Sequence, residues 1–435
     1  MHGWSDYVIW WQVYPLGFAG APDVLADHRG GPGDGLRRLT GWLDHLIELG
    51  ANGLLLNPVF TSMSHGYDTL DYLEVDPRLG TGEDFDALVA ACRERGIRGV
   101  LDGVFNHVGR DFPRLRQALA EGPGSDAARW FRWSTGPDDT VHPYLFEGHE
   151  QLVALDHDEP EVAGFVGDVL RHWLRRGVDG WRLDATYTIP PEFWARVLPA
   201  VREEFGEAWI VGEMIHGDYA DYVRRSGIDS VTAYELWAAI WHSLDTRNFF
   251  ELEHTLGRHA GLLESFTPMT FVSNHDVSRV ASQVSDTRHH DHAAVLLAFL
   301  PGTPCLYYGD EYGFTGVKEE RLGGDDAIRP ELPGSPAALD PGPAARQVED
   351  LYRRLVAFRR RHPWLADAHV RAADVANEAV TLTATPRTGD HAPLTLQLTL
   401  GGGPVPLVPH TEVVEAGGPL EGAELPPHSW VVTRA

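Results

Sequence analysis

Short apolar segments alternate with amphipathic segments along most of this chain of 435 residues. Eight of the apolar segments have the length and composition of strands that are buried on both faces. They are residues 7–15, 51–60, 96–105, 178–185, 208–213, 230–236, 268–276 and 303–311. The segments between them have helical spacing, as in residues 160–176, where one apolar face ends at Gly177. Eight strands alternating with helices predict an α/β fold, a (β/α)8 TIM barrel.

Two segments interrupt this alternation. Residues 109–155 follow the third strand and are rich in turn residues and aromatics, so we expect a small inserted subdomain over the barrel mouth. Residues 364–435 show the two-residue alternation of strands, which predicts a C-terminal antiparallel β-sandwich. The barrel itself is then expected to comprise residues 1–108 and 156–363.

The charge and the cysteines exclude several classes of protein. The net charge is −27 and Lys318 is the only lysine, so neither nucleic acid nor an anionic membrane surface is expected as a partner. We find no signal-peptide pattern and no segment long enough to span a bilayer, and we expect a cytoplasmic protein. Cys92 and Cys305 lie in apolar segments and are expected to be packed thiols, not a disulfide or metal ligands.

The stretch GVDGWRLDATY (177–187) places two charged side chains in an apolar strand. Residues two apart share a face of a strand, so Arg182 and Asp184 point one way, and Trp181 and Leu183 the other. An ion pair that closes the strand would explain the two charges. In a TIM barrel, however, the active site lies at the carboxyl ends of the strands. Other strand ends and the loops after them also carry polar residues: His65, Tyr67, Asp68, Asp102, Asn106, His107, Glu213, Asn274, His275 and Asp276.

Several carboxylates at one rim indicate a particular chemistry. Carboxyl groups that lie close together raise one another's pKa, so that one stays protonated while its neighbour is ionised. Glycoside hydrolysis uses this division between a general acid and a nucleophile. Arg182 is then expected to keep Asp184 ionised and oriented.

Five short motifs at these strand ends resemble those of the α-amylase superfamily, glycoside hydrolase family 13. They are HGYD (65–68), DGVFNH (102–107), GWRLDA (180–185), VGE (211–213) and SNHD (273–276). The resemblance covers about residues 7–360 and implies a TIM barrel. It also implies that Asp184 is the nucleophile, Glu213 the acid/base and Asp276 the residue that stabilises the transition state. Tyr67 would stack on the sugar. The residues that would bind the hydroxyls of the sugar, or the nucleophile, are Asp68, His107, Arg182 and His275.

Within the superfamily, two stretches resemble the group of neopullulanases, cyclomaltodextrinases and maltogenic amylases. They are LDATYTIPPEFW (183–194) and DDAIRP (325–330). The second implies that Asp326 and Arg329 contact the non-reducing side of the substrate. Members of the group usually carry an N-terminal domain that helps them to dimerise, whereas this sequence starts directly in the first barrel strand. Whether the chain forms a homodimer is therefore left as an open question.

Three other positions differ from the patterns of the family. Tyr187 and Thr188 stand where the group has Asn-Glu and where secreted α-amylases have Lys-His, whose His offers a backbone contact to calcium. We therefore expect no cofactor and no metal, although Asn106 is sometimes a calcium ligand in the family. Ile215 replaces a tryptophan that the group carries on the leaving-group side. The resemblance therefore says least about how this side of the site binds the substrate.

The expected function is a retaining hydrolase of α-glucosidic bonds, mainly α-1,4, in short or cyclic maltooligosaccharides. A transglycosylase or isomerase would use the same covalent intermediate, and a plain α-amylase would act on starch. A non-catalytic relative is disfavoured because Asp184, Glu213 and Asp276 are all present. A metal-dependent hydrolase built on His65, His107 and His275 is disfavoured because each lies in a motif where a sugar-binding role is expected.

Overall fold

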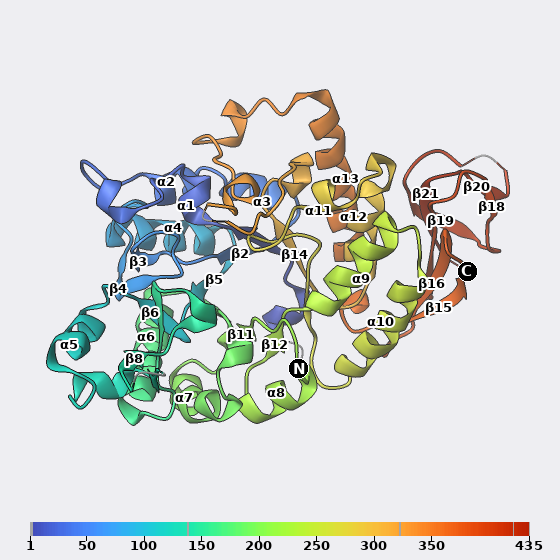
Figure 1. The fold of residues 1–435 in the computed structure, drawn as a ribbon. Coiled ribbons are helices and arrows are strands. Elements are labelled where there is room, and N and C mark those ends of the chain that lie inside the picture. The colour runs from blue at the N-terminus through green and yellow to red at the C-terminus, as the bar shows by residue number, and fades with distance from the viewer. Residues whose placement is uncertain (1–2, 137–138, 322, 421, 435) are drawn as a thin grey trace.

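The computed structural model describes residues 3–136, 139–321, 323–420 and 422–434. Eight parallel strands form one sheet in the order β12-β11-β10-β5-β2-β1-β14-β13. Their bounds are β1 Trp10–Val13, β2 Gly53–Leu56, β5 Arg98–Gly103, β10 Gly180–Leu183, β11 Trp209–Gly212, β12 Ser230–Val231, β13 Met269–Thr270 and β14 Thr303–Tyr307. A parallel bridge between Thr232 and Met269 joins the two edge strands. The predicted barrel is therefore confirmed (Figure 1).

Helices form the outer ring of the barrel (Figure 1). The longer ones are α4 Gly82–Glu94, α6 Pro160–Arg176, α7 Pro191–Glu204, α8 Tyr219–Ser226, α9 Tyr234–Asp245, α10 Phe250–Leu262, α12 His290–Phe299 and α13 Gly342–Arg361. The shorter ones are α1 Pro15–Phe18, α2 Gly35–Thr40, α3 Leu43–Glu48 and α11 Val280–Gln283. Thr81 and Asp84 form a capping box at the start of α4. Gly177 ends α6 with φ 107°, in the left-handed region that glycine tolerates.

The predicted strand 230–236 is wrong in its second half. Only Ser230 and Val231 belong to β12, and α9 begins at Tyr234. Leu236, Ala239 and Ile240 lie at helical spacing and are all buried, so packing favours a helix over a longer strand.

The core has two parts, one outside the strands and one inside the barrel. Trp181 and Leu183 of β10 are fully buried in the outer part, between strands and helices, whereas Arg182 points the other way. The predicted alternation along this strand is thus confirmed. Cys92 and Cys305 are buried free thiols, as expected.

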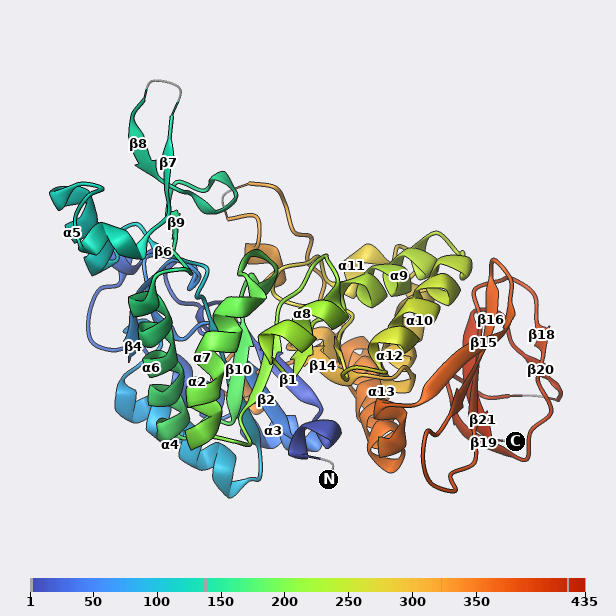
Figure 2. The same ribbon diagram turned by 90° about the horizontal axis from the view of Figure 1, so that it is seen from below.

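The segment after β5 forms a small subdomain at the carboxyl ends of the strands. In it, β6 His107–Gly109 pairs with β9 Leu152–Ala154, and β7 Trp133–Thr135 pairs with β8 Val141–Pro143. Helix α5 Pro113–Glu121 and the β7–β8 hairpin stand at one end of the barrel (Figure 2). A second hairpin, β3 Phe60–Ser62 with β4 Thr69–Val75, carries the loop that contains Tyr67.

The C-terminal part is a separate antiparallel unit. Five strands pair in the order β15-β16-β17-β21-β19, and β18 pairs with β20 beside them. Their bounds are β15 His369–Val375, β16 Ala379–Thr385, β17 Leu394–Thr399, β18 Val405–Pro406, β19 Glu412–Ala416, β20 Glu424–Leu425 and β21 Ser429–Arg434. The unit lies beside α10, α12 and α13, away from the inserted subdomain (Figure 2). None of the helices in the described part of the chain is both long and apolar enough to cross a membrane.

Candidate active site

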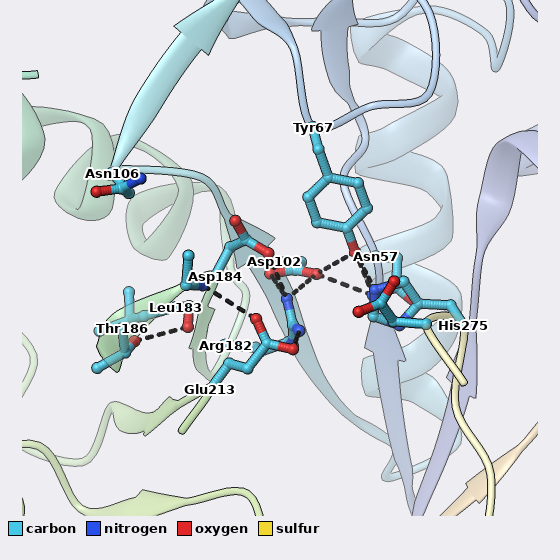
Figure 3. Close-up of polar contacts among 12 residues, drawn as sticks. Asn57, Tyr67, Asp102, Asn106, Arg182, Leu183, Asp184, Thr186, Glu213 and His275 are labelled. Carbon is cyan, nitrogen blue, oxygen red and sulfur yellow. Dashed lines mark hydrogen bonds and ion pairs between the residues drawn. The ribbon is translucent and has the colours of Figure 1, made fainter. Parts of the chain in front are cut away.

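Arg182 is the centre of a buried cluster of carboxylates at the strand ends (Figure 3). Its Nη1 lies 2.7 Å from both carboxylate oxygens of Asp102 and 3.3 Å from Oδ1 of Asp184. Its Nη2 lies 2.7 Å from Oε1 of Glu213. The expected contact between Arg182 and Asp184 is present, but the shorter contacts are with Asp102 and Glu213. One guanidinium therefore holds three carboxylates from three neighbouring strands.

The turn after β10 links the two proposed catalytic carboxyls. Asp184 directly follows the last residue of β10, and Ala185 has φ 45°, a conformation that is unfavourable for a residue with a Cβ. This conformation lets the Ala185 N–H donate to Oε2 of Glu213 at 3.0 Å. Thr186 donates to the Leu183 carbonyl at 2.7 Å and closes the turn. The backbone next to Asp184 thereby fixes the position of Glu213.

Glu213 is held from the opposite side by Tyr234. The Tyr234 hydroxyl donates to Oε1 of Glu213 at 3.0 Å and accepts from the Asn274 amide at 3.0 Å. Burial and the nearby charge of Asp276 raise the pKa of Glu213, and Arg182 opposes them. Burial and the charge of Glu213 raise the pKa of Asp184. Two neighbouring carboxyls with raised pKa values can keep one proton between them, as an acid and a nucleophile require.

His275 and Tyr67 form a second polar group beside Asp102 (Figure 3). The Tyr67 hydroxyl donates to Oδ2 of Asp102 at 2.9 Å and lies 2.5 Å from Nε2 of His275. Asn57 donates to the same oxygen of Asp102 at 2.8 Å, and the Gln12 amide lies 3.0 Å from Nδ1 of His275. Burial and the charge of Arg182 lower the pKa of His275 well below its ordinary value, so its ring is neutral.

Asp68 and His107 support the loop that carries Tyr67. Asp68 is buried and accepts from the backbone and the hydroxyl of Ser64, at 3.0 and 2.5 Å. Nε2 of His107 donates to the Tyr67 carbonyl at 3.1 Å, and Phe146 stacks on the His107 ring at 4.6 Å. Burial lowers the pKa of His107 to about 3, so it is neutral. Their role in binding sugar hydroxyls stays a prediction.

The structure brings Arg329 to the site, where it pairs with Asp325. Nε of Arg329 donates to the His275 carbonyl at 2.9 Å, and its Nη2 lies 2.9 Å from Asp325. Asp326 is exposed. Asp325 lies four residues before Arg329, at the start of the 3₁₀ turn Asp326–Ile328, and the two side chains meet. Contacts of Asp326 and Arg329 with the substrate stay a prediction.

Asp276 lies at the rim of the cluster, where its side chain is 38% exposed. Its Oδ1 accepts from Nζ of Lys318 at 2.7 Å, and its backbone N–H donates to Asn274 at 2.8 Å. All three expected catalytic carboxyls are therefore at one end of the barrel. Their roles stay predictions.

Sequence reasoning did not assign a role to four residues that belong to this site. Asn57 directly follows the apolar β2, which is a signal that the sequence offers. Gln12 is a polar residue inside the buried strand β1. Lys318 is the only lysine of the chain. Tyr234 has no comparable signal, because it reads as part of an apolar strand.

The donors near Asn106 bear on the predicted absence of a metal. Its side chain contacts the His107 ring at 3.1 Å and lies apart from the carboxylates (Figure 3), which are the ligands that calcium prefers. Within the described ranges, one cluster of possible metal ligands lies close enough together to share an ion. It consists of Asp286, His289 and His428. There, Arg288 already contacts both oxygens of Asp286, at 2.8 and 2.6 Å. Independence of metal stays a prediction.

Comparison with known proteins adds a family to this geometry. Residues 12–370 match the model of the alpha amylase catalytic domain. The maltogenic alpha-amylase of Bacillus acidopullulyticus is 30% identical over 390 residues, which are 84% of this chain and 64% of the relative. The cyclomaltodextrinase of Geobacillus thermopakistaniensis is 30% identical over 389 residues, 82% of this chain and 63% of the relative. The chain thus spans less than two thirds of the length of these curated relatives.

Among solved structures, one match covers both chains almost completely. The ligand-free cyclic alpha-maltosyl-(1→6)-maltose hydrolase of Arthrobacter globiformis has a TM-score of 0.79 at 27% identity, over 99% of each chain. Its likeness therefore includes the barrel, the inserted subdomain and the C-terminal unit.

Proposed function

Because the chain belongs to the α-amylase family of glycoside hydrolases, we propose that it is a retaining hydrolase of α-glucosidic bonds in short or cyclic maltooligosaccharides. The observation that carries the proposal is the contact of Arg182 with Asp102, Asp184 and Glu213 in one buried cluster. The α-1,4 bond is the main expected target.

In the proposed mechanism, Asp184 and Glu213 divide the chemistry of the two steps. Asp184 attacks the anomeric carbon while protonated Glu213 gives its proton to the leaving oxygen, and a covalent glucosyl-enzyme forms. Glu213, now a carboxylate, removes a proton from water, which attacks the same carbon and releases Asp184. Asp276 stabilises the positive charge that develops on the sugar ring.

Contacts across the barrel mouth support a small substrate. The Tyr187 hydroxyl donates to Glu147 of the inserted subdomain at 3.0 Å, and the His216 ring packs against Tyr187 at 5.0 Å. This bridge lies next to Asp184, on the side of the site where Ile215 replaces the tryptophan of the group. A narrow mouth favours ligands that fill a pocket over long polymers.

The names of the similar proteins support the same substrate class. The Arthrobacter hydrolase, which matches over the whole of both chains, is named for a cyclic sugar that contains an α-1,6 bond. Small cyclic glucans with α-1,6 bonds therefore belong in the substrate panel beside cyclodextrins and linear maltooligosaccharides. A cytoplasmic location, where starch granules do not occur, is part of the proposal.

Two measurements test the proposal. Proton NMR of the first product should show the α-anomer, and an initial β-anomer would exclude the retaining mechanism. Chromatography of products from cyclodextrins, pullulan, starch and maltotriose should show hydrolysis that is fastest on the small sugars. Longer products that increase with an added sugar acceptor would instead favour a transglycosylase.

A further inference from the structure

The only lysine of the chain places its ammonium group on Asp276. Lys318 is the one lysine among 36 Lys and Arg residues. Its Nζ donates to Oδ1 of Asp276 at 2.7 Å and to the Asp276 carbonyl at 3.1 Å. It also lies 3.9 Å from Oδ1 of Asp325.

Hydrogen bonds tie the loop that carries Lys318 to the segment after Asp276. The Lys318 N–H donates to the Ser278 hydroxyl at 2.9 Å, and the Arg279 N–H donates to the Gly316 carbonyl at 2.9 Å. Gly316 packs so closely that an added Cβ would lie 2.3 Å from the Ala327 carbonyl oxygen. The ammonium group is therefore delivered to Asp276 by a loop that is fixed on both sides.

The other two cations of the site are already engaged. Arg182 contacts Asp102, Asp184 and Glu213, and Arg329 pairs with Asp325. The cation in direct contact with the Asp276 carboxylate is Lys318. Although burial disfavours the charged form, the Asp276 carboxylate raises the pKa of Lys318 above its ordinary value. A positive charge at this point offsets the repulsion between Asp276 and Glu213.

We propose that Lys318 is a positioning residue, which keeps Asp276 oriented toward the sugar and offsets its charge in the field of Glu213. The proposal rests on the proposed function. An ammonium group has three donors on a flexible stem. The ammonium group can give up its bond to Oδ1 of Asp276 when that oxygen accepts from a sugar hydroxyl. Its bond to the Asp276 carbonyl then remains. Lys318 thus prepares Asp276 in the free enzyme without blocking it in the complex.

The test compares neutral variants with a variant whose charge is restored chemically. We expect Lys318→Met and Lys318→Cys to lower kcat/KM on maltotriose about 10- to 100-fold, mainly through kcat. Treating the Lys318→Cys variant with 2-bromoethylamine attaches an aminoethyl group to sulfur and rebuilds a side chain of nearly the length and charge of lysine. This treatment should recover most of the activity, whereas iodoacetamide, which adds a neutral group, should not.

The native thiols make this modification selective. Cys92 and Cys305 are buried, and burial raises the pKa of Cys92 to about 12, so neither thiol forms the reactive thiolate easily. The side chain of Lys318 is 30% exposed, so we expect a thiol at that position to be accessible to the reagent. Arg321→Met, which removes a charge from the exposed part of the same loop, is the matched control and should change kcat/KM by less than about twofold.

The pH profile separates positioning from a structural role. Several ionisable groups surround Asp276. They are Lys318 and Asp325 in the loop after β14, Glu213 after β11, Tyr234 of α9, and Arg329. His275, which directly precedes Asp276, is neutral. Without the ammonium group, the charge of Asp276 acts on Glu213 unopposed, so the pKa of Glu213 rises. The basic limb of the profile of Lys318→Met should therefore move to higher pH.

The outcomes distinguish the two proposals. A wild-type enzyme with no activity on any α-glucan would refute the proposed function. An active wild type with a Lys318→Met variant of unchanged kcat and pH profile would overturn the role of Lys318 alone. Loss of activity that aminoethylation and iodoacetamide restore equally would also overturn it, because the charge would then be irrelevant.

Discussion

Nη2 of Arg182 lies 2.7 Å from Oε1 of Glu213, which is closer than the 3.3 Å between Nη1 of Arg182 and Asp184. The arginine therefore holds the proposed acid/base at least as firmly as the proposed nucleophile. Since burial and Asp276 raise the pKa of Glu213 while Arg182 opposes them, the acidity of this carboxyl depends on a balance of neighbours. One buried guanidinium thus couples the ends of β10 and β11.

The first prediction separates the roles of Asp184 and Glu213. Asp184→Asn and Glu213→Gln should each lower kcat on maltotriose by about 10³-fold or more, because they belong to one catalytic unit. On α-maltosyl fluoride, whose leaving group needs no proton, Glu213→Gln should still form the glycosyl-enzyme, whereas Asp184→Asn should not. Release of fluoride in a burst is the measurement.

Asp168→Asn is the matched control for both variants. Asp168 is an exposed carboxylate on α6 that pairs with Arg171, so its removal should leave kcat unchanged. If Glu213→Gln is as inactive on the fluoride as Asp184→Asn, the acid/base assignment is wrong.

The second prediction concerns pH. The charge of Asp102 contributes to the raised pKa of both Asp184 and Glu213. Asp102→Asn should therefore lower both pKa values. Since activity requires ionised Asp184 and protonated Glu213, both limbs of the profile of kcat against pH should move to lower pH. A profile that moves up, or that keeps its shape at a lower kcat, would contradict this balance.

The sequence predicts the barrel well because each strand is a short apolar run that is buried on both faces. Trp181 and Leu183 bury their side chains outside the barrel, and the polar residues at the strand ends follow from the same pattern. The pattern fails at residues 232–236, because Tyr234 and Leu236 are apolar enough for either a strand or a helix. Only tertiary packing selects the helix there.

The candidate site is less predictable where contacts depend on three-dimensional register. The pair that Arg329 forms with Asp325 beside the 3₁₀ turn Asp326–Ile328 is not predicted, because the sequence does not show how this loop folds over the strand ends. The contacts of Arg182 with Asp102 and Glu213 join three strands, and a pattern within one strand can propose only the contact with Asp184. Lys318 reaches Asp276 from 42 residues away along the chain.

The third prediction concerns stability. Burial and the charge of Glu213 raise the pKa of Asp184 in the folded state above the unfolded value of about 3.9. Ionised Asp184 therefore destabilises the fold at pH 7, and this cost vanishes as the pH falls below the unfolded pKa. Asp184→Asn should raise Tm at pH 7 by about 2 °C or more, with a smaller effect near pH 4.

Scanning calorimetry at the two pH values measures this difference. Asp168→Asn, which removes an exposed carboxylate, should leave Tm unchanged. A lower Tm for Asp184→Asn at pH 7 would mean that its contact with Arg182 contributes more than burial costs.

The fourth prediction is that EDTA does not inactivate the enzyme. Tyr187 and Thr188 replace the Lys-His pair of secreted α-amylases, whose His offers a backbone contact to calcium, and the Asn106 side chain contacts His107. We expect unchanged kcat and Tm after dialysis against EDTA. Activity that is lost on chelation and restored by Ca²⁺ would show that Asn106 and the inserted subdomain hold an ion.

The shape of the mouth leads to the last prediction, on substrate size. Of the six aromatics in residues 109–155, Phe112, Trp130 and Phe131 are buried. Phe146 stacks on the His107 ring. The bond between Tyr187 and Glu147 joins the turn after β10 to this subdomain. Both contacts place subdomain residues over the strand ends, where we expect them to narrow the approach to Asp184.

We therefore expect kcat/KM for maltotriose or small cyclic glucans to exceed that for soluble starch at least about tenfold per bond, which corresponds to about 1.4 kcal/mol of transition-state binding. Tyr187→Phe keeps the ring but removes the hydroxyl that holds Glu147, so it should raise the relative rate on starch. Tyr144→Phe is the control, because that exposed ring packs against Arg132 and not across the mouth. Initial rates of reducing-end formation on each substrate measure the ratio. Equal or faster rates on starch for the wild type would refute the narrow pocket and make the protein an ordinary α-amylase.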